Sequence, residues 1–375
     1  MSTTYSAFTG TYSAARANFL HAAEQAGGRI DTRAHPLTGP SGDPLAMDVA
    51  LLGDGDAKTV VVCLCGVHGA EGYAGSAVQT AWLRRNHADT LAQGVAMLFV
   101  HGVNPWGFAH GLRGTEDNID VNRNWLDHTK PHPQNPLYGE IHPYLCPDDL
   151  SASSIDRMLD AAARFVDAHG QWALEDAVSR GQYTYPDGYH FGGTELAWST
   201  QQLRDVLRIR LRHAERVAYV DFHSGPPGDG ETIFLCFSRA ESPARRRAAD
   251  WWGQDALNPR TVENQWGAPR PTRSGIIFWG IEHMLTGQAE VAGAVVEFCS
   301  SSRQRDPRRI MRIAMLERWL RFVGGLDAPE APAYLTEIRE NYAPRRPAWE
   351  ARVETAGIRV LDTALLGATD WAYGR

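Results

Sequence analysis

The chain has 375 residues, of which 43% are hydrophobic, and this composition is typical of a globular protein and excludes an intrinsically disordered chain. The formal net charge of −7 disfavours nucleic acid as a partner, since phosphate binding needs a basic surface. No apolar run approaches the length of about 18 residues that a membrane span requires, and the start of the chain lacks the pattern of a signal peptide, so a cytoplasmic protein is expected.

The predicted elements alternate between helices and strands. In chain order, we expect a helix over 6–27, strands over 45–52 and 59–67, a helix over 76–85, a strand over 94–105, helices over 154–180 and 200–213, strands over 215–225 and 231–238, a helix over 242–252, a strand over 293–301 and a helix over 306–323. The strands are mostly continuous apolar runs, which are typical of strands buried on both faces. The alternation predicts an α/β protein with three α/β/α layers and a mixed, mostly parallel central sheet.

Polar residues gather where the predicted strands end. His68, Asn104, His223 and Glu297 each lie at or just beyond the end of such a strand. Ligands of open α/β sheets bind at the carboxyl ends of the strands, so these positions predict one shared site. A long polar segment over 106–149 interrupts the alternation, and loops of that length in a compact domain are usually functional.

The stretch LCGVHGAEGYAGS contains a candidate pair of metal ligands. His68 and Glu71 are three residues apart, and an imidazole and a carboxylate at this spacing can bind one Zn²⁺ from a turn. A catalytic zinc commonly has three protein ligands and an open position for water, and His223 in VDFHSG is the candidate third ligand. Taken alone, the H-x-x-E pattern is weak evidence for a metal, and it favours an ordinary loop with a histidine and a helix-start glutamate.

The segment between these ligands, NPWGFAHGLRGTEDNIDVNRNW, carries candidate substrate-binding residues. Arg113 and Arg123 offer guanidinium groups, and Asn122 offers an amide. Such groups suit the recognition of a planar carboxylate and the stabilisation of a developing oxyanion. The alternative for this segment is a polar surface loop with weak salt bridges.

The ordered motifs HGAE, N-P-(…)-R-(…)-D-x-N-R-N, DFH and VVEF resemble those of the zinc carboxypeptidase superfamily. Their spacing is similar to that of the aspartoacylase and succinylglutamate desuccinylase branch. The fuller pattern, including GQYTYPDGYHFGGTE, is similar to a bacterial branch catalogued as a domain of unknown function. The resemblance spans about residues 61–320. It implies a central sheet of the zinc carboxypeptidase type, with a catalytic domain over 1–325 and a C-terminal appendage packed on it over 326–375.

The resemblance also implies a role for each site residue. The implied zinc ligands are His68, Glu71 and His223. Glu297 would be the general base that deprotonates the zinc-bound water, and Arg113 would stabilise the oxyanion. Asn122 and Arg123 would hold the free carboxylate of the substrate.

One departure from the peptidase pattern concerns a tyrosine. Peptidase members place a substrate-contacting tyrosine some twenty residues before the catalytic glutamate, and here Phe278 and Trp279 stand in that neighbourhood. Tyr185 or Tyr189 could supply a phenol from another loop, and His190 in that loop is a further candidate site residue.

The sequence therefore predicts a zinc-dependent hydrolase that cleaves an amide bond in a small-molecule or peptide substrate with a free carboxylate. It would act as a carboxypeptidase or as an N-acyl-amino-acid deacylase. The alternatives are a catalytically silent binding protein of the same fold and an esterase. No nucleic acid or membrane partner is expected, and the oligomeric state stays open.

Overall fold

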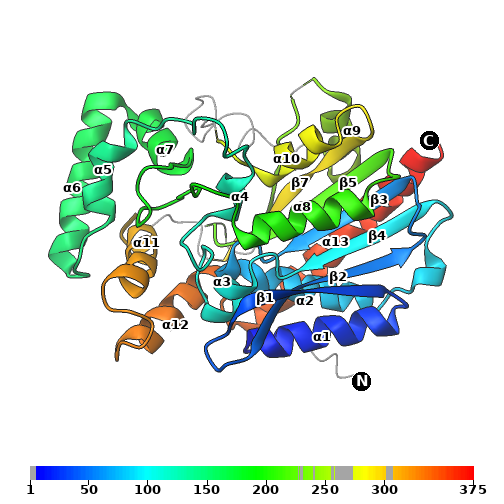
Figure 1. Cartoon of the computed structure of the whole chain (residues 1–375), viewed down its shortest axis with the longest axis horizontal. Helices are drawn as coiled ribbons and strands as arrows, with labels where there is room; N and C mark the ends of the chain where they lie inside the picture. Colours follow the sequence, from blue (N-terminus) through cyan, green and yellow to red (C-terminus); the bar gives the residue numbers. More distant parts are fainter. Residues whose placement is uncertain are drawn as a thin grey trace.

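The chain folds around one seven-stranded sheet with helices on both faces (Figure 1). The computed structural model describes residues 6–226, 228, 231–239, 241–254, 257, 273–300 and 307–375. The strands are β1 (Arg29–Thr38), β2 (Pro44–Gly53), β3 (Thr59–Cys65), β4 (Val95–His101), β5 (Arg216–Ser224), β6 (Thr232–Leu235) and β7 (Glu290–Phe298). This arrangement confirms the predicted three-layer α/β/α class.

The order of the strands across the sheet is β1-β2-β4-β3-β5-β7-β6. The sheet is mixed, as predicted: the four central strands are parallel, and antiparallel pairs form both edges. A short connection joins β1 to β2, and only an antiparallel hairpin permits so short a connection. All residues of β3 and β4 are buried, which agrees with their continuous apolar sequences.

The helices connect the strands and extend beyond the sheet. They are α1 (Tyr12–Gln25), η1 (Gly69–Glu71), α2 (Gly72–Leu83), η2 (Ala88–Thr90), α3 (Pro105–His110), α4 (Val121–Asn124), α5 (Tyr138–Leu145), α6 (Ala152–His169), α7 (Gln171–Ser179), α8 (Trp198–Arg210), α9 (Pro243–Trp252), α10 (Ile277–Met284), α11 (Pro307–Phe322), α12 (Ala331–Tyr342) and α13 (Pro347–Ala372). Helices α1, α2, α9 and α13 cover one face of the sheet, and α8 and α10 cover the other.

Sequence reasoning missed several of these elements. Strand β1 is mostly exposed and polar, so it lacks the apolar run that marks a buried strand. The segment 106–149, expected to be a loop, contains most of α3 and the whole of the short helices α4 and α5. The single helix expected over 154–180 is split into α6 and α7 at Gly170, whose φ of 88° no helix accommodates.

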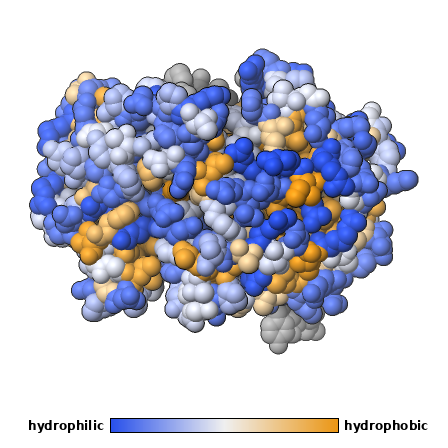
Figure 2. Space-filling model, viewed as in Figure 1, coloured by the Kyte–Doolittle hydropathy of each residue, from blue (hydrophilic) through white to orange (hydrophobic). Residues whose placement is uncertain are grey.

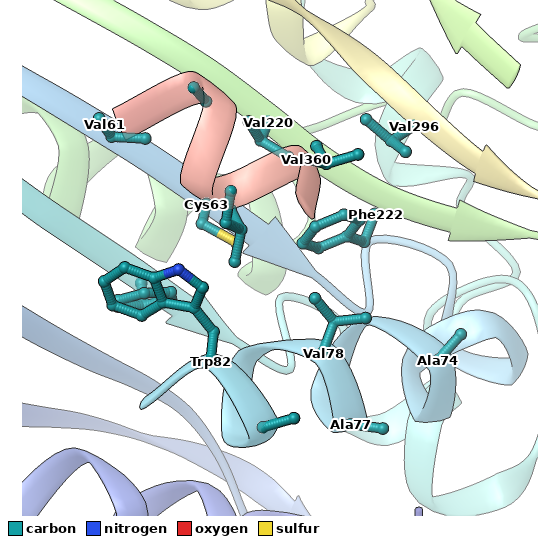
Figure 3. Packing of buried hydrophobic residues seen from close by; sticks show 14 of the residues in the cluster. Val61, Cys63, Ala74, Ala77, Val78, Trp82, Val220, Phe222, Val296 and Val360 are labelled. Carbon is teal, nitrogen blue, oxygen red and sulfur yellow. The ribbon is translucent and has the colours of Figure 1, made fainter. Parts of the chain in front are cut away.

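The main hydrophobic core lies between the sheet and α2 with α13 (Figure 3). Val78 and Trp82 project from α2, and Val360 projects from α13, toward the strand residues Val61 and Val220. Every residue of α2 is buried, because α1 and α13 both pack on it. Gly357 permits the close approach of α13, since a Cβ there would lie 2.3 Å from a methyl carbon of Val78.

The C-terminal part of the chain contributes to this core through α13. Trp349 and Leu361 are fully buried and belong to the same cluster as the strand residues. The division of the chain into a catalytic domain over 1–325 and an appendage over 326–375 stays a prediction. Helices α5, α6 and α7 pack on one another and beside α11, away from the sheet (Figure 1).

Hydrophilic residues dominate the face of the molecule shown in Figure 2, and hydrophobic residues form separate patches among them. None of the described helices is both long enough and apolar enough to cross a membrane. All five cysteines lie among the described residues and none of them forms a disulfide; Cys146 is half-buried and the other four are buried.

Candidate metal centre

The candidate ligands come from two adjacent strands. β3 and β5 are parallel neighbours, so their carboxyl ends meet at one edge of the sheet. His68 follows β3 after two residues, Glu71 closes the 3₁₀ turn η1, and His223 is the penultimate residue of β5. The turn is held against the next segment, because Gly69 N donates to the carbonyl oxygen of Arg113 over 3.0 Å. A Cβ on Gly69 would lie 2.0 Å from the backbone of α3, which explains the glycine in HGAE.

The side chains of His68, Glu71 and His223 converge, and all three are buried. The two Nδ1 atoms are 3.1 Å apart, and each lies 3.0 Å from a different oxygen of Glu71. Ligand atoms around a tetrahedral Zn²⁺ lie about 3.3 Å apart, given bonds of about 2.0–2.1 Å. The three side chains therefore fit one small divalent cation.

The outer nitrogen of each imidazole faces a carboxylate. His68 Nε2 lies 3.1 Å from an oxygen of Asp120, and His223 Nε2 lies 2.9 Å from an oxygen of Asp221. A proton on His223 Nε2 can be donated to Asp221, whereas His68 Nε2 also lies 2.9 Å from Arg113 Nη2 and can accept from that guanidinium. Imidazoles whose outer nitrogen is held by a carboxylate are typical of zinc ligands.

Electrostatics at the site favour charged forms despite burial. Burial alone would raise the pKa of Glu71, but His68 and His223 hold that pKa below its usual range. Burial would lower the pKa of His223, and Asp221 and Glu71 raise it well above its usual value. The acidic side chains thus stay ionised and available to a cation.

Arg113 lies beside the ligand set. Its Nη1 donates to Glu71 Oε1 over 2.9 Å, and its Nη2 donates to Asp120 Oδ2 over 3.2 Å. Its backbone N–H donates to the buried carboxylate of Glu317 on α11. Asn104 does not reach the ligands: it caps α3 by accepting from Gly107 N and donates to the carbonyl oxygen of Arg113. Asn104 therefore supports Arg113 through the backbone.

Asn122 and Arg123 lie on the short helix α4, whose N-cap is Asp120. Asn122 Oδ1 accepts from the backbone N–H of Ile277, which leaves Nδ2 to donate elsewhere. The guanidinium of Arg123 donates to the carbonyl oxygens of Ser179 and Asn122. Among the described residues, no carboxylate lies within ion-pair distance of Arg123, so its buried charge has no direct counter-ion there.

Glu297 faces the ligands from the next strand. It stands on β7 opposite His223 in the parallel register, and its side chain is half-buried. Burial raises the pKa of Glu297 to about 7, with Glu71 raising it further and the two histidines lowering it. A carboxyl group with this pKa can take up and release a proton near neutral pH.

The two tyrosines that could supply a phenol, Tyr185 and Tyr189, lie in different surroundings. Tyr185 stacks on His142, with 4.1 Å between the ring centroids, and belongs to the cluster around α5 and α6. Tyr189 shares a hydrogen bond with Tyr342, and both tyrosines raise the pKa of Arg113. Tyr342, which sequence reasoning missed, ends α12 and accepts through its carbonyl oxygen from Ser224 Oγ over 2.7 Å.

Two further residues were missed although the sequence carries a signal for them. Asp221 and His223 are two residues apart on one strand, so their side chains share a face of the sheet. Asp120 precedes Asn122 by two residues in the D-x-N pattern, where it caps a helix. No local signal points to Glu317 or Tyr342, because long-range packing places them.

Comparisons with known proteins fit the predicted relationship. The sequence model of the family described as "Protein of unknown function (DUF2817)" matches residues 8–356, which confirms the expected branch of unknown function. No curated protein shows a sequence match to the chain.

Several solved structures are similar to the chain. Carboxypeptidase A from Helicoverpa armigera has a TM-score of 0.46 at 11% identity, with 89% of this chain and 74% of that chain covered. Bovine thrombin-activatable fibrinolysis inhibitor, in complex with tick carboxypeptidase inhibitor, has a TM-score of 0.46 at 14% identity, with 96% and 99% covered. Succinylglutamate desuccinylase from Chromobacterium violaceum has a TM-score of 0.35 at 17% identity, with 81% and 72% covered.

Proposed function

Since the chain belongs to the DUF2817 family of proteins of unknown function, its activity has to be inferred from its own residues, and we propose that it is a zinc-dependent hydrolase. It would cleave an amide bond in a small-molecule or peptide substrate that has a free carboxylate. The observation that carries the proposal is the convergence of His68, Glu71 and His223, whose ligand atoms all lie within 4.8 Å of one another. A carboxylate also lies next to the outer nitrogen of each imidazole.

Zinc held by these three side chains would lower the pKa of a bound water and polarise the substrate carbonyl. Glu297 accepts the proton of the attacking water and passes it to the leaving amine, and its pKa of about 7 suits both transfers. Arg113, within 2.9 Å of Glu71, is close enough to donate to the oxyanion that develops on the carbonyl oxygen.

Binding of the substrate carboxylate is assigned to Asn122 and Arg123. The Asn122 side chain keeps Nδ2 as a donor, and Arg123 is a buried cation with carbonyl partners. A buried charge is stabilised when a counter-ion approaches it, so a carboxylate of the substrate is favoured there.

The test is a metal analysis followed by assays on the purified protein. Near-stoichiometric zinc and hydrolysis of at least one member of a panel of dipeptides and N-acyl amino acids are expected. Glu297→Gln should lose at least about 100-fold in kcat while it retains zinc, because the ligands are unchanged. A Glu297→Gln enzyme as active as the wild type contradicts the mechanism.

Two outcomes distinguish the alternatives. Turnover of simple esters without a carboxylate, with no turnover of the acyl amino acids, identifies an esterase. A protein without zinc and without turnover, which still binds panel members, identifies a binding protein.

A further inference from the structure

His190 has an unusual backbone conformation in a loop that is firmly held. Its φ is 51°, a region that non-glycine residues rarely adopt. Just before it in the chain, Asn118 Nδ2 donates to the carbonyl oxygens of Pro186 and Gly188, and Tyr189 N donates to the hydroxyl of Tyr138 over 2.6 Å. Such strained conformations persist where the surroundings over-determine them, and they cluster at ligand-binding sites.

The hydrogen bonds of His190 fix its tautomer. Nδ1 lies 2.8 Å from the carbonyl oxygen of Val178, which can only accept, so Nδ1 carries the proton. Burial, together with Arg123 and Arg113, lowers the pKa of His190 well below its usual value, which keeps the imidazole neutral. Nε2 is therefore an acceptor.

This acceptor faces a second one. His190 Nε2 lies 3.9 Å from Asp120 Oδ2, which is too far for a direct hydrogen bond, and Oδ2 acts as an acceptor, since Arg113 Nη2 donates to it over 3.2 Å. Two acceptors at this separation suit one nitrogen that carries two hydrogens and donates one to each. Arg113 donates only to the Asp120 oxygen of this pair, which keeps a second lone pair, and Arg318 donates to Asp187.

The two acceptors line a pocket next to the metal centre. Its walls include Arg113, Asp120, Tyr189, His190, Glu317 and Arg318. Asp120 and Arg113 both contact His68, so the pocket is one side chain away from the ligands. The cavity measures about 30 Å³, and a water needs at least about 10–15 Å³ by this measure, so it holds a small polar group and excludes an aromatic ring.

We propose that this pocket selects substrates and that His190 and Asp120 together bind an –NH₂ or –NH₃⁺ group of the substrate side chain. The inference rests on the proposed function, and it names the substrate class: N-acyl amino acids or dipeptides whose released residue carries a primary amide or an amine. A carboxylate at the same position meets two acceptors and is disfavoured.

The test compares three side chains of similar length on wild-type and variant protein. Free glutamine, ornithine and glutamate are titrated by calorimetry, and the kcat/KM of their N-acetyl derivatives is measured. His190→Gly removes the imidazole, and glycine adopts the observed φ without strain. His213→Gly is the control, because His213 is largely exposed just before β5 begins, at the end of that strand opposite the metal centre.

The wild type and His213→Gly should bind glutamine or ornithine at least about 10-fold more tightly than glutamate, and His190→Gly should bring the ratio to within about twofold. Tighter binding of glutamine shows that the pocket prefers an amide, and tighter binding of ornithine shows that it prefers an ammonium group. Equal binding of all three by the wild type, no binding of any, or an unchanged ratio in His190→Gly overturns the inference. If the binding preference is present without turnover, the pocket stands and the proposed hydrolase activity fails.

Discussion

Replacing Asp221 with asparagine tests whether the buried carboxylates prepare the histidines for a metal. Asp221 is completely buried, and its Oδ2 accepts from His223 Nε2 over 2.9 Å and from the Tyr219 hydroxyl over 3.0 Å. Asparagine keeps the shape and an acceptor oxygen but loses the charge. Loss of such a carboxylate typically weakens metal binding by about 10–100-fold, or about 1.4–2.7 kcal/mol.

The upper end of that range is expected for Asp221→Asn. The other oxygen, Oδ1, has no hydrogen-bond partner among the described residues, so the new NH₂ group would be buried without an acceptor. Zinc affinity is measured by competition with a chromogenic chelator. Tyr219→Phe is the matched control: it removes one donor to the same oxygen and should change affinity by less than about threefold. Affinity of Asp221→Asn within twofold of the wild type refutes the reasoning.

Three further outcomes are expected. Because Glu297 acts as a base and has a pKa of about 7, kcat/KM should rise as pH increases through about 7, and a flat profile between pH 5.5 and 8.5, or loss of activity on the alkaline side alone, contradicts that role. Gly293→Ala should lower the free energy of unfolding by more than about 3 kcal/mol in urea titrations, since its Cβ would lie 2.0 Å from Tyr219 O. Gly287→Ala, where φ is also positive but the space is open, should lower it by about 1–2 kcal/mol. Removing zinc with a chelator should lower the calorimetric Tm, because a metal at about 1,000 times its Kd stabilises the fold by about 4 kcal/mol, and an unchanged Tm argues against binding at this site.

The sequence indicates that His68 and His223 lie close together, but it does not indicate which side chains pack around them. His68 and His223 follow or end strands that are recognisable from their apolar runs, and parallel strands bring such ends together. The glycines of HGAE are explained by the backbone contact at Gly69. Zinc binding and the catalytic roles of these residues stay predictions, because the sequence and the geometry define a fitting donor set and not an occupied one.

Other features were out of reach of local patterns. β1 is an exposed edge strand, and its polar sequence does not differ from that of a loop. Glu317 and Tyr342 approach the centre from α11 and α12, which lie far beyond β5 in the chain. Only the packing of those helices decides where their side chains point, and sequence periodicity does not encode it. The role of Arg123 as a ligand for the substrate carboxylate stays a prediction, and its backbone carbonyl partners in the structure are a further feature that no local pattern indicates.

The position of α13 has a consequence for how the protein is made. The helix lies directly on β3 and β5, yet it is synthesised almost three hundred residues after β3. Until it emerges from the ribosome, apolar side chains such as Val61 and Val220 lack the part of their cover that α13 provides. Nascent chains that stop short of this helix should therefore depend on chaperones and be prone to aggregation, and the metal centre, which is anchored on the same two strands, should mature only after translation has passed it.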